Sequence, residues 1–206
     1  MRFPTAIAVA AAVLTASASG STRAVPPAPL TWAPPALTNP ITIDVANANR
    51  RLFLDDSRDY RLNIVEPLER ELWIEGGRNV VVIGGDITIE QIGDAAAYQD
   101  NTAVKVRFGD PSGTVHLEGL LIDGRYVSDG FGVATRRNVQ IQNVRVERAY
   151  DDLKNAHADC VQIQRGVGQL RMDRFTCSTE RQGIFLGDHD GPIGRASCRE
   201  RVSECV

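Results

Sequence analysis

Several residues with functional groups suited to acid–base chemistry lie in the second half of the chain, in segments without strand-like alternation. Removing the proton next to a sugar carboxylate requires a base, together with a cation or an arginine that neutralises the carboxylate. Lys154 or His157 could be the base, and Asp129 and Asp159 add carboxylates close to them. The sequence therefore predicts these four residues as the catalytic candidates for an elimination of this kind.

Three more residues in these segments, and one on the outward face of the strand beside them, have side chains that suit a long, polar, acidic polymer. Arginine pairs with carboxylates, amides hydrogen-bond hydroxyl groups, and an aromatic ring packs against the face of a sugar. The predicted substrate-binding residues are Arg125, Tyr126, Gln162 and Arg181. An equally simple interpretation is that these segments are polar only because loops lie at the surface.

Two neighbouring carboxylates, Asp151 and Asp152, are the candidate metal ligands. Calcium prefers several oxygen ligands, so these residues together with Asp129 and Asp159 could hold Ca²⁺. The sequence indicates no other cofactor.

An imperfect repeat must position these residues. The same pattern of alternating apolar residues occurs in three segments, 115–122, 139–146 and 170–177, and an earlier copy begins at Val80. Each copy reads as two short strands joined by a bend, and self-similarity at this spacing is typical of a solenoid. The sequence therefore predicts about four repeats of three strands, which begin at residues 80, 115, 139 and 170.

A third apolar alternation follows each pair of strands, as in Val161 and Ile163. Stacked repeats would place Ile122, Val146 and Cys177 above one another, and Val133, Ile163 and Leu186 likewise. A more weakly matching copy of the pattern precedes residue 80. Because equivalent loops of a solenoid lie along one corner, the candidate residues are expected to gather there.

Three segments, 76–85, 137–144 and 157–162, resemble the right-handed parallel β-helix of the pectate-lyase type. The resemblance extends over residues 41–191 and is specific for the fold. It implies an all-β, single-stranded parallel β-helix and favours a polysaccharide lyase that cleaves an acidic, uronate-containing glycan by β-elimination.

Two alternatives remain open. The chain is also similar to the polygalacturonase branch of these enzymes, because Ser128-Asp129-Gly130 and Asp159-Cys160-Val161 each keep one aspartate of that branch's motifs. Ala158 replaces a second aspartate and Gln182-Gly183 lacks the histidine, so the resemblance leaves half of the two-carboxylate apparatus of a hydrolase missing. A non-catalytic glycan-binding or adhesin β-helix is the other alternative.

The two ends of the chain differ from the repeat. Residues 1–24 read as a signal peptide, with an apolar run too short to span a bilayer, and residues 25–40 as a proline-rich spacer. The β-helix domain is expected over residues 41–192. Residues 193–206 resemble the translation of a common sequencing adapter, which implies that the natural array continues and that the domain is incomplete.

The composition and the expected export limit the classes of partner that this protein could bind. With 23 Lys and Arg against 26 Asp and Glu, the chain has a net charge of −3, which does not favour nucleic acid. We expect a secreted or periplasmic monomer that binds polysaccharide and has no stable membrane anchor. Strand parity predicts that Cys160 faces outward and Cys177 inward, so that they do not pair, and that His116 is exposed.

Overall fold

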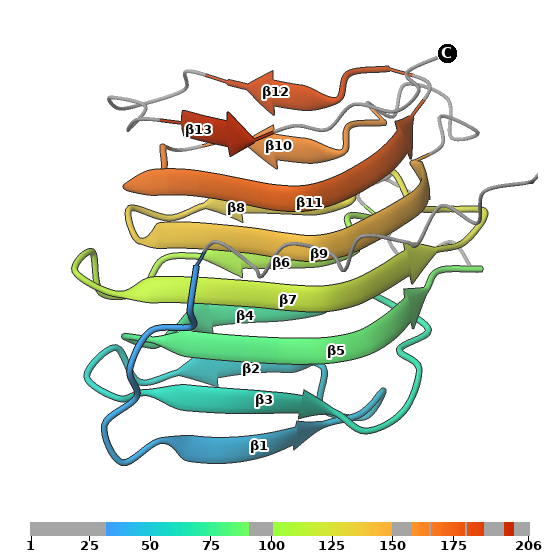
Figure 1. The fold of residues 1–206 in the computed structure, drawn as a ribbon. Coiled ribbons are helices and arrows are strands. Elements are labelled where there is room, and N and C mark those ends of the chain that lie inside the picture. Colours follow the sequence, from blue (N-terminus) through green and yellow to red (C-terminus); the bar gives the residue numbers. More distant parts are fainter. Residues whose placement is uncertain are drawn as a thin grey trace, which may run out of the picture.

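The computed structural model describes residues 32–90, 101–149, 158–164, 166–179, 181–187 and 196–199. Over these residues the protein is all-β, with strands in two parallel sheets (Figure 1). The described part of the chain contains no helix long and apolar enough to cross a membrane.

The seven-stranded sheet, sheet A, contains every odd-numbered strand in sequence order. Its strands are β1 (Ile41–Val45), β3 (Tyr60–Ile64), β5 (Val80–Thr88), β7 (Thr114–Asp123), β9 (Asn138–Ala149), β11 (Gln169–Thr179) and β13 (Ala196–Arg199).

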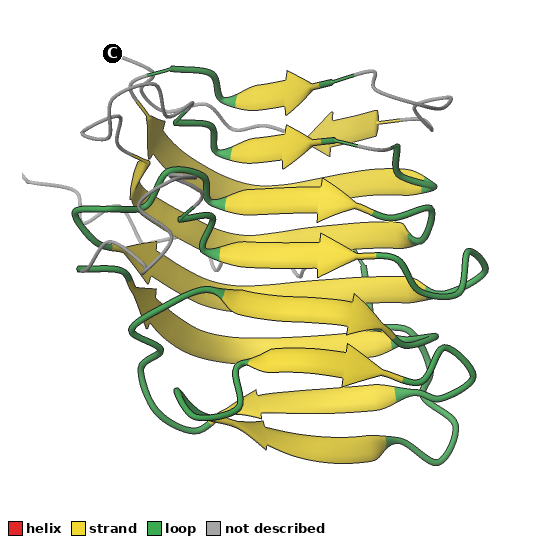
Figure 2. Ribbon diagram, turned by 180° about the vertical axis from the view of Figure 1, so that it is seen from behind, coloured by secondary structure: helices red, strands yellow, loops and turns green. Residues whose placement is uncertain are grey.

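The six-stranded sheet, sheet B, contains the even-numbered strands and lies behind sheet A, as Figure 2 shows from the other side. The chain therefore passes from one sheet to the other after every strand. The strands of sheet B are β2 (Arg51–Leu54), β4 (Leu72–Gly76), β6 (Val104–Arg107), β8 (Phe131–Ala134), β10 (Val161–Ile163) and β12 (Ile184–Leu186).

The predicted register of the repeat is confirmed. Val80 pairs with Val115, Val115 with Val139, and Val139 with Leu170. These four side chains are buried, and the core between the sheets is built from such stacks of aliphatic residues. The predicted stacks are also found: Ile122, Val146 and Cys177 are paired in sheet A, and Val133, Ile163 and Leu186 in sheet B.

The bend inside each repeat differs from the prediction. The sequence predicted two short strands joined by a bend, but β5, β7, β9 and β11 are each one long strand. A residue with left-handed backbone geometry lies within each of them, which turns the strand without ending it: Gly84 (φ 74°), Gly119 (φ 69°), Asn143 (φ 51°) and Arg174 (φ 50°). A repeat therefore consists of two strands, one of them bent.

Residues 32–40, the N-terminal strap, lie against the outward side of sheet A. The strap was predicted as part of a spacer, but it makes specific contacts. The side-chain amide of Gln142 on β9 donates to the carbonyl oxygen of Trp32 at 2.9 Å. The amide of Thr38 donates to Asp59 beside β3 at 2.6 Å. The strap thus reaches from the first repeat to β9, whereas most contacts in a solenoid join neighbouring repeats.

Asp59 anchors both the strap and the next repeat. Its buried carboxylate accepts hydrogen bonds from the guanidinium of Arg78 at 2.7 Å and from the backbone amide of Asn79 at 3.3 Å. The hydrogen bond from Arg78, helped by the backbone donors and opposed by burial, lowers the pKa of Asp59 to about 2. The folded state therefore favours the ionised carboxylate.

We expect the stability of the protein to fall in acid because of Asp59. The unfolded carboxyl has a pKa near 3.8 and the folded one near 2, so the stabilisation is present above the first value and is lost as the pH falls through the second. The loss should be about 2 kcal/mol in the free energy of unfolding. Urea unfolding at pH values from above 3.8 to below 2 measures this loss. Asp59→Asn should be less stable at neutral pH and should lack this part of the acid dependence; an unchanged dependence would contradict the assignment.

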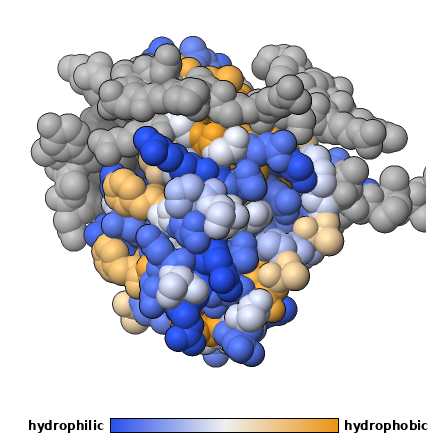
Figure 3. Space-filling model, turned by 90° about the vertical axis from the view of Figure 1, so that its left-hand side faces the viewer, coloured by the Kyte–Doolittle hydropathy of each residue, from blue (hydrophilic) through white to orange (hydrophobic). Residues whose placement is uncertain are grey.

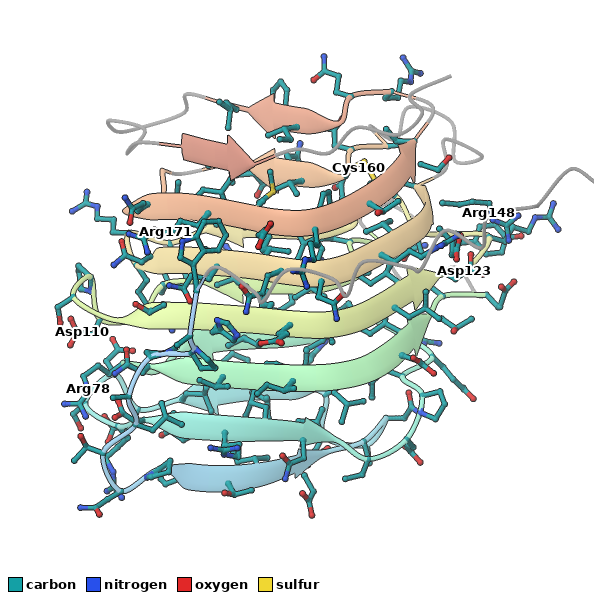
Figure 4. All side chains as sticks on the ribbon, viewed as in Figure 1. Arg78, Asp110, Asp123, Arg148, Cys160 and Arg171 are labelled. Carbon is teal, nitrogen blue, oxygen red and sulfur yellow. A yellow bond between two sulfur atoms is a disulfide. The ribbon has the colours of Figure 1, made fainter. Side chains whose placement is uncertain are left out.

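One prediction about the cysteines was wrong. Cys160 and Cys177 form a disulfide, with Cα atoms 6.1 Å apart (Figure 4). Strand parity failed because Cys160 precedes β10 and lies in the turn, where its side chain is buried. Cys177 was correctly placed in an inward stack on β11. The bond joins the turn before β10 to β11 of the following repeat.

Reduction of this disulfide should destabilise the protein. It closes a loop of 17 residues, for which the restriction of the unfolded chain corresponds to about 3 kcal/mol. We expect urea unfolding of the Cys160→Ser, Cys177→Ser double variant to show a loss of this order, and a reducing agent to lower the stability of the wild type but not of the variant. Equal stability of the two proteins under oxidising conditions would argue against the bond.

Candidate functional site

The loops that lead from sheet A to sheet B stack along one corner, as predicted. We call residues 101–103, 124–130, 158–160 and 181–183 the loop corner. Hydrogen bonds between backbone amides and backbone carbonyl oxygens join successive loops. They run from Ala103 to Asp129, from Gly130 to Asp159 and from Cys160 to Gln182, at 2.8 to 3.1 Å. Residues far apart in the sequence are therefore neighbours at this corner.

Two of the predicted catalytic residues, Asp129 and Asp159, meet there, but both are buried. The Asp129 side chain is 5% exposed and Asp159 is fully buried. One carboxylate oxygen of Asp129 accepts the backbone amide of Asp159 at 3.0 Å, and the other accepts the hydroxyl of Thr102 at 3.2 Å. These bonds connect three successive loops, so the geometry favours a structural role for Asp129.

The predicted binding residues occupy different places. Tyr126 is half-buried and packs against the core, while the guanidinium of Arg125 lies over its ring at 5.5 Å. Arg181 is exposed at the end of the corner. Gln162 is on β10, where its side-chain oxygen accepts a hydrogen bond from Gln164 at 2.9 Å. The loop corner thus does not bring these side chains into one cluster.

Four predicted residues lie outside the described residues: the candidate bases Lys154 and His157, and the candidate metal ligands Asp151 and Asp152. Among the residues that the structure describes, no group of three or more His, Cys, Asp or Glu is arranged to hold a metal ion. The calcium site therefore stays a prediction.

The outward side of sheet B carries a second group of residues, which the sequence reading missed. Trp73 on β4 is paired in register with Arg51 on β2 and with Lys105 on β6. The charged groups of Arg51, Lys105 and Arg107 lie 5.6, 5.0 and 5.1 Å from the centre of the Trp73 ring. Three cations around one indole give this part of the sheet a concentrated positive charge.

The same row continues across the sheet as Gly132, Gln162 and Phe185. Because Gly132 has no side chain, a hollow of about 170 Å³ lies over β8. We call this face the basic strip; the hollow is lined by Trp73, Thr102, Lys105, Arg107, Gly132, Ala134 and Gln164.

Two carboxylates lie beside these cations. The guanidinium of Arg51 binds Glu71, with Nε 2.9 Å from the carboxylate. Burial opposes the ionisation of Glu71, but the hydrogen bond and charge of Arg51 outweigh it and lower the pKa of Glu71. Glu75 accepts a hydrogen bond from the Trp73 indole at 3.1 Å, which fixes the ring. The hydrogen bonds of Glu71 and Glu75 thus hold Arg51 and the Trp73 ring in place on the basic strip.

Part of the outward side of sheet A is covered by the protein's own side chains. His116 was predicted to be exposed, but it is fully buried. Its ring nitrogens lie 2.8 Å from the Gln140 side-chain oxygen and 2.9 Å from Glu118. Gln142 bonds both Glu118 and Trp32, and Arg171 lies over the Trp32 ring at 5.9 Å. Strand parity correctly predicted that His116 lies on the outward side of sheet A. It could not predict that the N-terminal strap also lies on that side.

A signal for the basic strip was present in the sequence. Trp73 alternates with Leu72 and Ile74, and Lys105 alternates with Val104 and Val106, so both side chains had to face outward. The repeat also aligned Leu72 and Ile74 with Val104 and Val106, and the pairing of β4 with β6 confirms this, but the cations around Trp73 were not recognised as a group.

Comparison with known proteins gives no relative: no family model, no curated protein and no solved structure matches this chain. The interpretation of the site therefore depends on its geometry and charge.

Replacement of Asp129 tests its structural role. In Asp129→Asn one of the two accepting oxygens becomes an amide nitrogen, so a buried donor at the loop corner loses its partner. We expect a loss of about 1–3 kcal/mol in the free energy of unfolding, measured with urea. Thr102→Val, which removes only the hydroxyl bond, should cost less. Full stability of Asp129→Asn would contradict the structural role.

Proposed function

We propose that this chain is an exported protein that binds an acidic, uronate-containing polysaccharide on the outward face of sheet B. The observation that carries the proposal is the basic strip, in which Arg51, Lys105 and Arg107 surround Trp73 at 5.0 to 5.6 Å. Arginine and lysine bind carboxylates, while the amides of Gln162 and Gln164 suit sugar hydroxyls.

The proposed fold is a right-handed parallel β-helix of the pectate-lyase type. In support, the chain alternates between two parallel sheets and keeps its register over successive repeats. A regular stack of this kind repeats its outward positions at the strand spacing, which gives a long polymer several equivalent points of contact.

The proposed reaction is β-elimination next to the uronate carboxylate. Such a reaction requires neutralisation of the carboxylate, for which Lys105 and Arg107 are suitable, and a base, for which Lys154 and His157 remain the candidates. Hydrolysis would require two carboxylates on either side of the bond. Asp129 and Asp159, which both the hydrolase and the elimination interpretations drew on, are buried in the loop corner, so the proposed elimination uses Lys154 or His157 as its base and not these carboxylates.

Export is the proposed localisation. The Cys160–Cys177 disulfide supports it, since such bonds persist in oxidising compartments such as the periplasm or the cell exterior.

Binding and turnover can be measured with polygalacturonate, alginate and a sulfated glycosaminoglycan, with a neutral glucan for comparison. We expect the acidic polymers alone to bind, with affinity falling as salt is added. Lys105→Ala and Arg107→Ala should each weaken binding about tenfold, because each removes a charge-assisted contact. Arg61→Ala removes an exposed arginine of β3 in sheet A and is the matched control.

Elimination produces an unsaturated uronate end that absorbs in the ultraviolet. A rise in absorbance on one of the acidic polymers, with or without Ca²⁺, is the expected result. Binding without a rise would contradict the reaction but not the binding site. Failure of every acidic polymer to bind, or equal binding by the Lys105 and Arg107 variants, would overturn the proposed site.

A further inference from the structure

A larger cavity lies at the opposite corner, where strands of sheet B end and the chain turns toward sheet A. Its volume is about 420 Å³. Figure 4 labels Arg78 and Asp110 at this corner, and Figure 3, which faces it, shows a mostly hydrophilic surface with separate apolar patches. The cavity is lined by Asp56, Phe108, Gly109, Pro111, Ala134, Thr135 and Arg136.

Phe108 presents an aromatic ring in this cavity at a cost in backbone energy. It has a left-handed backbone (φ 50°), a conformation that is strained for a bulky side chain, and the residue is 47% exposed. The surrounding chain enforces this geometry: the Phe108 amide donates to Ala134 at 3.0 Å, and its carbonyl accepts the hydroxyl of Thr135. A residue that combines backbone strain with an exposed aromatic ring in a cavity is a candidate for binding.

The cavity is connected to the basic strip through Arg107. The guanidinium of Arg107 lies 5.1 Å from the Trp73 ring and 5.3 Å from the Phe108 ring. Ala134 lines both the hollow over β8 and the cavity. The hollow and the cavity are therefore adjacent.

A buried arginine lies beneath the cavity floor. Arg137 is fully buried, and its guanidinium donates to the carbonyl oxygens of Gly76 at 2.6 Å and Gly77 at 3.0 Å. A Cβ atom at Gly109 would come within 2.5 Å of this guanidinium, so the floor is thin at that point. Burial lowers the pKa of Arg137 to about 10, which leaves it cationic at neutral pH.

The charges at the cavity are mixed. Asp56 and Arg136 line it, while Arg107 and the buried Arg137 adjoin it, and Asp110 is close enough to Arg137 to affect its pKa. Arg136 is exposed and lines the wall, where it can pair with a carboxylate or sulfate.

We propose that this cavity is a distal subsite for an acidic sugar residue of the polymer bound on the basic strip. The apolar face of the sugar packs on Phe108, and its acidic group pairs with Arg136. This inference rests on the proposed function of sheet B and extends it, since it predicts a preference for long chains over short ones.

Affinities of the full chain for galacturonate and guluronate oligomers, from the disaccharide upward, test this subsite. The wild type should bind more tightly as the oligomer grows long enough to reach the cavity. Phe108→Gly and Arg136→Gln should lose this gain, about tenfold for the long oligomers, and bind short ones like the wild type. Ile83→Ala, which trims an exposed apolar side chain of sheet A, should bind every length normally.

Phe108→Gly also separates binding from folding. Glycine accepts the left-handed conformation, so the variant should unfold at the same temperature as the wild type or a higher one. A large drop in that temperature with unchanged binding would show that Phe108 serves the fold, and would overturn the proposal.

The outcomes distinguish the two proposals. If Lys105→Ala weakens binding but both cavity variants bind long oligomers like the wild type, the subsite is wrong and the basic strip stands. If the wild type binds neither series of oligomers and none of the acidic polymers, the strip and the subsite are both wrong.

Discussion

Parallel pairing of each strand with its successor in the same sheet, in register, is the constraint on which the rest of the structure depends. It places Val80, Val115, Val139 and Leu170 above one another, so that inward positions form continuous apolar stacks. The same pairing must stack the outward positions. The row that joins Trp73 to Lys105 and Gly132 is therefore a direct consequence of the pairing that forms the core.

The two outward faces differ in their side chains. On sheet A, polar side chains around His116 bond one another, and the N-terminal strap lies over them. On sheet B, cations and an indole surround an open hollow. Clustered cations around an indole attract an anionic partner, whereas His116 is buried among the side chains that bond it. This contrast is the reason for placing the polysaccharide on sheet B.

Much of the fold could be predicted from the sequence, because apolar alternation fixes both the period and the facing of each strand. The starts at residues 80, 115, 139 and 170 and the stack of Ile122, Val146 and Cys177 follow from it. The strands β1 and β2 were not foreseen, since they lie at the end of the array and have few buried positions.

The site was harder to predict, because alternation describes one strand and not its neighbours. It placed Cys160 outward, but the residue lies in a turn to which parity does not apply. It placed His116 in solvent, but the ring is buried and bonded to Gln140 and Glu118. Asp129 was expected on an open ridge, and instead the hydrogen bonds of adjacent loops bury it.

The central claim is that the outward face of sheet B, and not that of sheet A, receives an acidic glycan. An NMR titration of the full chain with a galacturonate oligomer tests it directly through the backbone and indole N–H shifts. The account predicts changes at the Trp73 indole and at the amides of Lys105, Arg107 and Gln162, with the amides of His116 and Gln142 unaffected. Changes confined to sheet A, with none at Trp73 or Lys105, would contradict it.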